Sequence, residues 1–306
     1  MTTTLTALRR QIGSAGDLKS VVRTMKASAA SAIGQYEQSV AALADYARTV
    51  ELGLSLCLRA VDPQGAQRQA PNTTAADAVV HAIVFGSDQG LVGRFNEVVV
   101  EHALAQLSPS SDKTTVKVWA VGERVQARLI DAGIDLEGSF AVPGSVALIT
   151  QLVGQILLTA QLPDDPAMSA MPRATLLLFY NRPSESGYSP VSQRLLPLDA
   201  SWQRELAAQA WPTAQLPEVL GNPAPALQAF IREHLFVSLF RASAESLASE
   251  NASRLAAMQR AGRNIGELLQ RLQANFHQLR QASIDEELFD VIAGFDALLP
   301  HDAGDT

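Results

Sequence analysis

The sequence has 306 residues, of which 47% are apolar, and its formal net charge is −7. This length and composition predict a soluble globular protein of about one to three domains and exclude a largely disordered chain. The acidic balance also argues against a general nucleic-acid-binding protein, so we expect no nucleic-acid partner.

The chain has one cysteine, Cys57, which cannot form an internal disulfide. We therefore predict a small buried residue in a protein of a reducing compartment. The first ten residues lack the apolar core of a signal peptide. The most apolar window, residues 142–162, is interrupted by Gln151, Gly154 and Gln155, so we expect no transmembrane helix and no direct membrane insertion.

Residues 1–60 predict one long helix. From Val22 onward, apolar or small residues recur in alternating steps of four and three, and Lys26 is the only charged member. The series is Val22, Lys26, Ala29, Ile33, Tyr36, Val40, Leu43, Ala47, Val50, Leu54 and Cys57. A strict seven-residue repeat stays buried only if the helix winds around a partner helix in a left-handed supercoil.

A matching series lies in the last predicted helix, residues 226–296. Its members are Leu255, Met258, Gly262, Ile265, Leu269, Leu272, Phe276 and Leu279. Because both ends of one chain carry such a series, we predict an antiparallel two-helix coiled coil closed within the monomer. Two ordinary amphipathic helices in a bundle remain the alternative on the spacing alone.

The middle of the chain, residues 77–200, alternates apolar β-branched runs with helical spacing, after a polar linker near residues 61–76. We predict strands at residues 78–86, 115–121, 139–142 and 174–180, and helices at 96–107, 123–132 and 145–161. Residues 181–198 are expected to return as a loop or hairpin with an edge strand. The predicted fold class is α/β plus coiled coil, with a mostly parallel, Rossmann-like domain inserted between the two terminal helices.

A glycine-rich turn follows the first predicted strand, from Gly86 to Gly93. It does not fit a phosphate-binding P-loop, because Leu91 follows Gly90 where that motif requires lysine. The spacing of its glycines also differs from the dinucleotide-binding fingerprint. We predict that the glycines let the following helix pack closely and that Ser87 or Asp88 serves as a helix cap.

The sequence lacks the common catalytic and metal-binding motifs. The histidines form no metal-ligand pair with cysteine, and neither HExxH nor GxSxG occurs. The acidic run from Asp285 to Glu287 is expected to be a solvated helix face. We expect no catalytic residue, no cofactor and no metal.

The C-terminal residues themselves resemble a known family, the gamma subunit of F-type ATP synthases. Residues 249–264 are similar to the family pattern S-E-x-x-A-R-M-x-A-M-x-x-A-x-x-N, and residues 280–298 to R-Q-A-x-I-T-x-E-I-x-E-I-x-x-G-x-x-A-L. The matching positions include Arg254, Met258, Asn264 and Ile284. This spacing runs unbroken over both motifs.

Two weaker matches extend the resemblance over the whole chain. Residues 87–96 look like the family pattern S-D-x-G-L-C-G-x-x-N, with Ser87, Asp88, Gly90, Gly93 and Asn96 at its fixed places. Residues 10–14 and 20–30 are similar to the N-terminal pattern R-x-I-x-S followed by K-I-T-x-A-M, and the methionine of that pattern is Met25.

The resemblance implies a rotor. In this family the two long helices form a shaft inside a hexamer of alpha and beta subunits, and the α/β domain sits with an epsilon subunit on the c-type membrane ring. Nucleotide chemistry belongs to the beta subunits, so the chain is expected to be a non-catalytic subunit. The implied location is peripheral, at the cytoplasmic face of a bacterial inner membrane.

The family's contacts with the beta subunits map onto Arg280, Gln281 and Met25. The chain departs from the pattern at three places: Ser20-Val21-Val22 replaces K-I-T, Asp285 replaces threonine, and Val92 replaces cysteine. These departures predict a divergent branch, such as a second, ion-pumping F-type ATPase. The competing hypotheses are a stand-alone coiled-coil adaptor with an α/β ligand-binding head and a central-stalk subunit of a V-type or archaeal ATPase.

Overall fold

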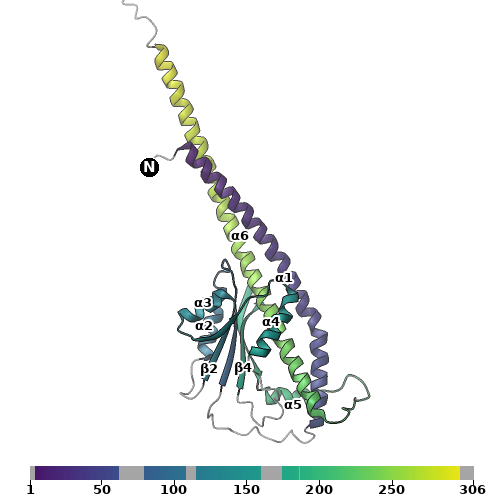
Figure 1. Cartoon of the computed structure of the whole chain (residues 1–306). Helices are drawn as coiled ribbons and strands as arrows, with labels where there is room; N and C mark the ends of the chain where they lie inside the picture. The colour runs from purple at the N-terminus through teal and green to yellow at the C-terminus, as the bar shows by residue number, and fades with distance from the viewer. Residues whose placement is uncertain (1–3, 62–78, 108–114, 160–173, 186, 297–306) are drawn as a thin grey trace, which may run out of the picture. The chain divides into compact units, whose positions relative to one another are not determined.

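The computed structural model describes residues 4–61, 79–107, 115–159, 174–185 and 187–296. Helix α1 (Leu5–Val61) and helix α6 (Pro223–Asp296) lie near the two ends of the chain, and an α/β region lies between them in sequence (Figure 1). This arrangement confirms the predicted fold class. The predicted polar linker lies mostly outside the described residues.

The chain forms two compact units that divide both long helices. One unit combines the start of α1, up to Ser28, with α6 from Ala256 onward. The other comprises residues 29–255 and contains the whole α/β region with the remaining part of each long helix. Each unit is described by itself below.

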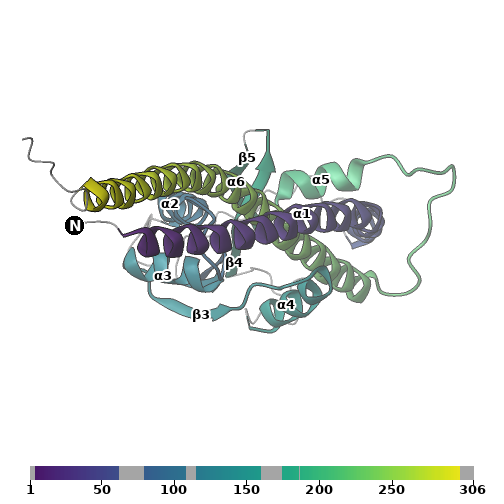
Figure 2. The ribbon, with the colours of Figure 1, turned by 90° about the horizontal axis from the view of Figure 1, so that it is seen from above.

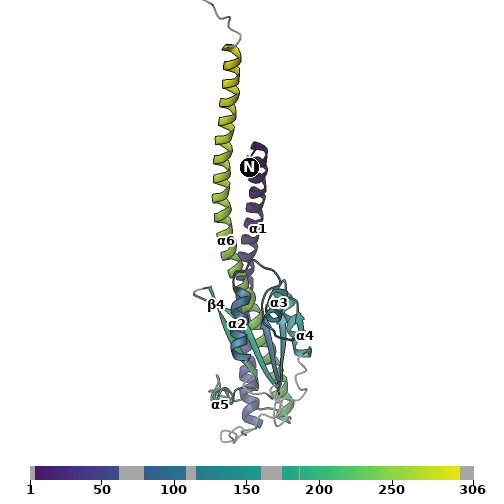
Figure 3. The same cartoon turned by 90° about the vertical axis from the view of Figure 1, so that its left-hand side faces the viewer.

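The first unit is a two-helix coiled coil with the predicted antiparallel direction. A Cβ atom at Gly262 of α6 would lie 3.6 Å from Cγ1 of Val22 in α1. Farther along, the Arg9 guanidinium lies 5.7 Å from the centre of the Phe276 ring. Later residues of α6 therefore meet earlier residues of α1, and α6 continues beyond the first turn of α1 (Figure 3).

The predicted seven-residue repeat matches the burial of both helices. In α1, every predicted position from Val22 to Cys57 is at least partly buried except Lys26, and half-buried Met25 occupies that place. In α6, the predicted positions from Leu255 to Phe276 are all shielded, and Leu279 is 39% exposed. The repeat therefore located the interface to within one residue.

The second unit is built on a five-stranded sheet with the order β3-β2-β1-β4-β5. Its strands are β1 (Val79–Phe85), β2 (Thr115–Val121), β3 (Leu136–Phe140), β4 (Ala174–Ser184) and β5 (Gly187–Leu196). The first four are parallel, and β5 pairs antiparallel with β4 at one edge, opposite β3 (Figure 2). This confirms the predicted hairpin, although β4 runs four residues beyond Tyr180.

Helices cover both faces of this sheet. Helices α2 (Phe95–Leu107) and α3 (Glu123–Asp131) pack on one face through a core that includes Val99, Val125 and Leu129. On the other face, α4 (Val146–Thr159) shares one core with α1 and α6 (Figure 1). The part of each long helix that belongs to the second unit, residues 29–61 of α1 and 223–255 of α6, is thus a layer of the α/β unit and not merely a connection to it.

Two local differences from the sequence-based expectation have simple causes. Strand β3 ends at Phe140, two residues before the predicted end, because Phe140 pairs with Val121, the last residue of β2. A short helix, α5 (Ala200–Ala208), was not predicted. It begins at an Asp199 cap whose carboxylate accepts a hydrogen bond from the Ser201 N–H, a local signal that the sequence did contain.

Candidate functional site

The candidate site is the junction between the turn after β1 and helix α6, in the second unit. The turn, which we call the glycine loop (residues 86–93), lies at the carboxyl end of β1. Strand β1 lies between β2 and β4, which are parallel to it, so the strand order changes direction at this point of the sheet. Such a switch point is the usual ligand crevice of a Rossmann-like sheet. Here the loop makes bonds to several elements of the protein.

Two glycines allow the backbone to approach closely at this junction. A Cβ atom at Gly86 would lie 2.3 Å from Cβ of Val125 and 2.6 Å from Oδ1 of Asn96. Gly122, at φ 115°, would place a Cβ atom 2.8 Å from the carbonyl carbon and oxygen of Ser87. This confirms that a glycine of the turn lets the following helix α2 pack closely.

Asp88 ties the glycine loop to two backbone segments. One carboxylate oxygen accepts a hydrogen bond from the Glu123 N–H at 3.0 Å, and the other accepts from the Val142 N–H at 3.0 Å. Asp88 is therefore a helix cap, as predicted, but it caps α3 and not the helix that follows the loop. The sequence could not indicate this, because the capped N–H lies 35 residues away.

Ser87 and Asn96 hold the start of α2 against the loop. The Ser87 N–H donates to the Asn96 side-chain oxygen at 3.0 Å, and the Asn96 amide donates to the Ser87 hydroxyl at 2.8 Å. Both residues are buried. On the neighbouring strand β4, the Asn181 amide donates to the Phe95 carbonyl at 2.8 Å, so the start of α2 is bonded to β4 as well as to the glycine loop.

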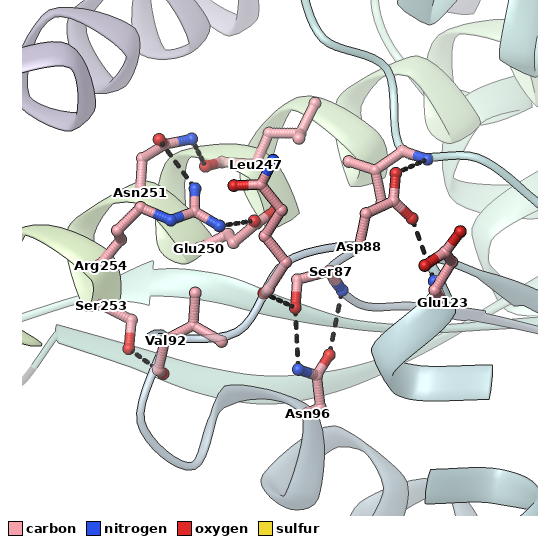
Figure 4. A network of polar contacts seen from close by, with 12 residues as sticks. Ser87, Asp88, Val92, Asn96, Glu123, Leu247, Glu250, Asn251, Ser253 and Arg254 are labelled. Atoms are coloured by element: carbon pink, nitrogen blue, oxygen red, sulfur yellow. Dashed lines mark hydrogen bonds and ion pairs between the residues drawn. The ribbon is translucent and has the colours of Figure 1, made fainter. Parts of the chain in front are cut away.

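Helix α6 contacts the glycine loop directly. The Ser253 hydroxyl donates a hydrogen bond to the Val92 carbonyl (Figure 4). The Val92 side chain is itself buried, so an aliphatic residue fits where the family pattern has cysteine. The loop is thus bonded on one side to α3 and on the other to α6.

One turn of α6 carries a buried ion pair beside this contact. The Arg254 guanidinium donates to Glu250 at 2.6 Å and lies 3.5 Å from the Asn251 side-chain oxygen (Figure 4). The two charged side chains are only 14% and 5% exposed. Burial raises the pKa of the Glu250 carboxyl, and Arg254 opposes that shift without cancelling it.

The same pair also acts on helix α1. Burial raises the pKa of the Tyr36 phenol, the Glu250 charge raises it further, and Arg254 lowers it. Tyr36 is a predicted seam residue and is 5% exposed. The ion pair therefore lies close enough to α1 to affect a residue of the helix interface.

Six of the predicted family-motif residues lie in this region, and four of them take part in its side-chain hydrogen bonds. Ser87, Asp88 and Asn96 lie in or beside the glycine loop, and Arg254 lies next to Ser253 of α6. Gly93 adopts a positive φ of 60°, whereas Gly90 makes no close approach that would require glycine. Leu91 also has a positive φ, of 64°.

The other predicted residues lie in the first unit. Met258 is 3% exposed, Met25 is half-buried, and the remaining ones, Asn264, Arg280, Gln281 and Ile284, are exposed on α6. Their roles toward partner subunits stay predictions. Glu250 is the glutamate of the family pattern matched over residues 249–264, whereas Ser253 and the buried Glu245 were not singled out from the sequence. The i, i+4 spacing of Glu245 to Arg241 was a signal for that ion pair.

The described parts of the chain contain no cluster of three or more His, Cys, Asp or Glu side chains placed to hold a metal ion. None of the described helices is long and apolar enough to cross a bilayer. The polar groups of the junction bond mainly to one another, so the arrangement serves to fix the glycine loop against α3 and α6.

The fold is shared with subunits of rotary ATP synthases. Over 93% of this chain and all of the other, it resembles a chain in the Euglena gracilis mitochondrial ATP synthase rotor, with a TM-score of 0.62 and 15% identity. A chain of the Tetrahymena thermophila mitochondrial ATP synthase central stalk and c-ring matches with a TM-score of 0.51, 20% identity and coverage of 79% and 99%. These likenesses concern the fold.

The sequence comparisons define the family. The family model described as ATP synthase matches residues 4–298, so the chain belongs to the ATP synthase family. An ATP synthase gamma chain of Granulibacter bethesdensis is 29% identical over 311 residues, which cover 96% of this chain and 99% of the relative. The resemblance to gamma subunits is thereby confirmed.

Proposed function

We propose that this chain is the central-stalk rotor subunit, gamma, of an F-type ATP synthase or ATPase. It couples ion flow across a membrane to ATP synthesis or hydrolysis on beta subunits by rotating. The observation that carries the proposal is an antiparallel coiled coil whose longer helix, α6, continues past the start of α1. Family membership over residues 4–298 supports it.

The shape of the first unit suits a shaft that turns inside a sleeve. Phe276 faces Arg9, so the last turns of α6 lie beyond the two-helix region. These turns expose large apolar side chains, namely Ile284, Leu288, Phe289, Val291 and Ile292. An exposed apolar surface of this kind requires a protein partner, and a hexamer of alpha and beta subunits supplies one.

The asymmetry of such a shaft is its mechanism. A two-helix coiled coil lacks the symmetry of a ring of three catalytic sites, so at any moment it presents a different side to each of them. A partner shifts a conformational equilibrium only through its differential affinity for the states, so each site responds to the face it meets. Moving one charge across 100 mV releases about 2.3 kcal/mol, so the energy of several ions must pass through this shaft for each ATP.

The chain itself has no catalytic role in this proposal, because the beta subunits hold the nucleotides. Its partners are the alpha and beta subunits, an epsilon subunit and the c-type ring. It resides peripherally at the cytoplasmic face of a bacterial inner membrane. The substitutions at Ser20, Asp285 and Val92 support a divergent branch, and assignment to a second, ion-pumping ATPase stays a prediction.

Co-expression with the alpha and beta subunits of the same genome tests the proposal. We expect a stable complex by size-exclusion chromatography with ATP hydrolysis that the subunits lack without this chain. If the chain elutes alone in every preparation and no activity assembles, the rotor assignment is wrong.

The predicted contact residues give a sharper test in the assembled complex. Arg280→Ala should lower ATP hydrolysis by about tenfold, the loss expected for one charge-assisted hydrogen bond. The isolated chain should keep its melting temperature, because Arg280 is exposed. Arg271→Ala, which removes another exposed arginine of the same helix, is the matched control. Equal activities of the two variants would contradict the assignment of Arg280.

A further inference from the structure

A three-residue polar cluster joins the sheet to α6 at a place distinct from the glycine loop. We call it the Glu245 cluster: Arg182 of β4 with Arg241 and Glu245 of α6. Oε2 of Glu245 lies 2.8 Å from Nε of Arg182, and Oε1 lies 2.8 Å from Nε of Arg241. The carboxylate is 9% exposed, whereas the two arginine side chains are 43% and 58% exposed. One buried carboxylate thus bonds to two partly solvated guanidinium groups.

The cluster continues into the last two strands of the sheet. Nη2 of Arg182 donates to the Tyr180 hydroxyl at 2.5 Å, and that hydroxyl donates to the Gln193 side-chain oxygen of β5 at 3.4 Å. The Tyr180 side chain is fully buried, and its phenol pKa is raised by burial and by the Glu245 charge. The polar path therefore crosses from the helix to β4 and on to β5.

This contact differs in kind from the apolar core around it. Residues of α1, α4, α6 and the sheet pack together in one continuous apolar cluster. Apolar contacts resist sliding through the interdigitation of side chains, but they are non-directional and do not by themselves select one orientation of a layer. Charge-assisted hydrogen bonds depend on geometry, and a slide of α6 by one helical turn, about 5.4 Å, would break the bond between Glu245 and Arg182 of β4, whereas Arg241 would move together with Glu245.

We propose that Glu245 is a positioning residue that transmits torque between the α/β sheet and the α6 shaft. It fixes the angular register of α6 against β4 through its bond to Arg182, while Arg241 of α6 holds the same carboxylate in place. Ser249, one turn further along α6, donates its hydroxyl to the Glu245 carbonyl and supports the same turn of helix. The inference rests on the proposed rotor function and adds the site where load crosses from sheet to shaft.

The test measures coupling in the complete membrane-bound complex with Glu245→Gln. The neutral amide keeps the size of the side chain but loses its charge. We expect ATP hydrolysis close to wild type and a fall in ions pumped per ATP of about twofold, the lower end of the change that a single mutation makes to the coupling between two sites. The fall should be largest against an opposing ion gradient, when the load is greatest. A purely structural defect would lower the amount of complex and not this ratio.

Three further variants make the result decisive. Glu267→Gln removes the carboxylate of an exposed i, i+4 pair on the same helix, where Glu267 and Arg271 are 3.8 Å apart, and should pump like wild type. Arg182→Gln removes the ion pair that joins β4 to α6 and should lower pumping per ATP as Glu245→Gln does, so it decides the question if Glu245→Gln does not assemble. Arg241→Gln removes only the bond within α6 and should give a smaller loss.

The outcomes separate this inference from the function on which it rests. If wild-type chain forms no complex with its partner subunits, the rotor assignment fails. If the complex forms and the cluster variants pump as many ions per ATP as Glu267→Gln, the torque-transmitting role of Glu245 is wrong.

Discussion

Two stretches of the same helix, α6, differ in how much of their surface is buried: one is enclosed on every side and the other on one side only. Between residues 242 and 251 every side chain is buried, and six of the ten are polar: Ser243, Glu245, Ser246, Ser249, Glu250 and Asn251. Between residues 261 and 279 only a stripe on one side is shielded, and the charged residues Arg263, Glu267 and Arg271 are exposed. A coiled coil thus needs one apolar seam, whereas a helix enclosed by a domain must satisfy polar groups on every side.

The difference explains why the polar contacts gather in the second unit. Apolar pairing in a coiled coil can be specified by spacing alone. A buried polar side chain costs free energy unless a partner is placed for it, and the partners here come from β4, from the glycine loop and from α6 itself. The enclosed stretch therefore determines how the α/β layers and α6 fit together.

The largest expected effect comes from breaking the buried ion pair. Arg254→Met would leave Glu250 buried without its partner and should destabilise the protein by about 3–5 kcal/mol at neutral pH. Arg271→Met breaks an exposed i, i+4 pair in the coiled-coil stretch and should cost less than about 1 kcal/mol. Urea unfolding of both variants measures the contrast. Similar losses of unfolding free energy would mean that burial of the ion pair does not determine its contribution to stability.

The pH dependence sharpens the same contrast. Burial raises the pKa of Glu250, so the folded protein binds this proton more tightly than the unfolded chain does. The stabilising contribution of the protonated group is present below the ordinary carboxyl pKa and is lost as pH rises through the folded pKa. The penalty of Arg254→Met should therefore shrink from about pH 8 to about pH 5, because the unpaired carboxyl can be protonated. A pH-independent penalty would contradict this.

Replacing two glycines of the helix interface by alanine should change the free energy of unfolding with opposite signs. A Cβ atom at Gly53 of α1 would lie 2.2 Å from Cε1 of Phe230 in α6, so Gly53→Ala should cost about 1–3 kcal/mol through overpacking. At Gly262 the nearest atom is 3.6 Å away, an ordinary contact, so Gly262→Ala should stabilise by about 0.5–1 kcal/mol through helix propensity. Thermal unfolding of the two variants would show a fall and a rise. Shifts of the same sign would refute the packing argument.

The smallest expected effect concerns His234, whose ring lies 4.9 Å from that of Trp202. Burial lowers its pKa, so the folded protein binds this proton less tightly than the unfolded chain. Wild-type stability should therefore fall as pH drops below about 6.5, the ordinary histidine value, whereas the stability of His234→Gln should not show this fall. Parallel denaturation curves at acidic and neutral pH give the difference. An unchanged difference would exclude His234 as the cause.

Much of the fold followed from local pattern. The residue-by-residue spacing placed the coiled-coil seam, and strand β2 has the predicted bounds, because periodicity and β-branched runs are local signals. Strand β3 and helix α5 were less well predicted, since one depends on pairing with a neighbouring strand and the other is only nine residues long. The sequence predicted part of the candidate site, because the family pattern included Ser87, Asp88, Asn96 and Arg254. Glu245 and Ser253 were identified only from their contacts in the structure.

By itself, the sequence determined the two long helices, their antiparallel pairing, the inserted α/β domain and the family. Tertiary structure alone decided that Asp88 caps α3 across 35 residues, that Glu245 bonds to β4, and that the parts of α1 and α6 in the second unit share the core of the sheet. The physical reason is the range of the interactions. Helix and strand periodicity is written in neighbouring residues, whereas the partner of a buried polar group is chosen by the packing of segments that are distant in the chain.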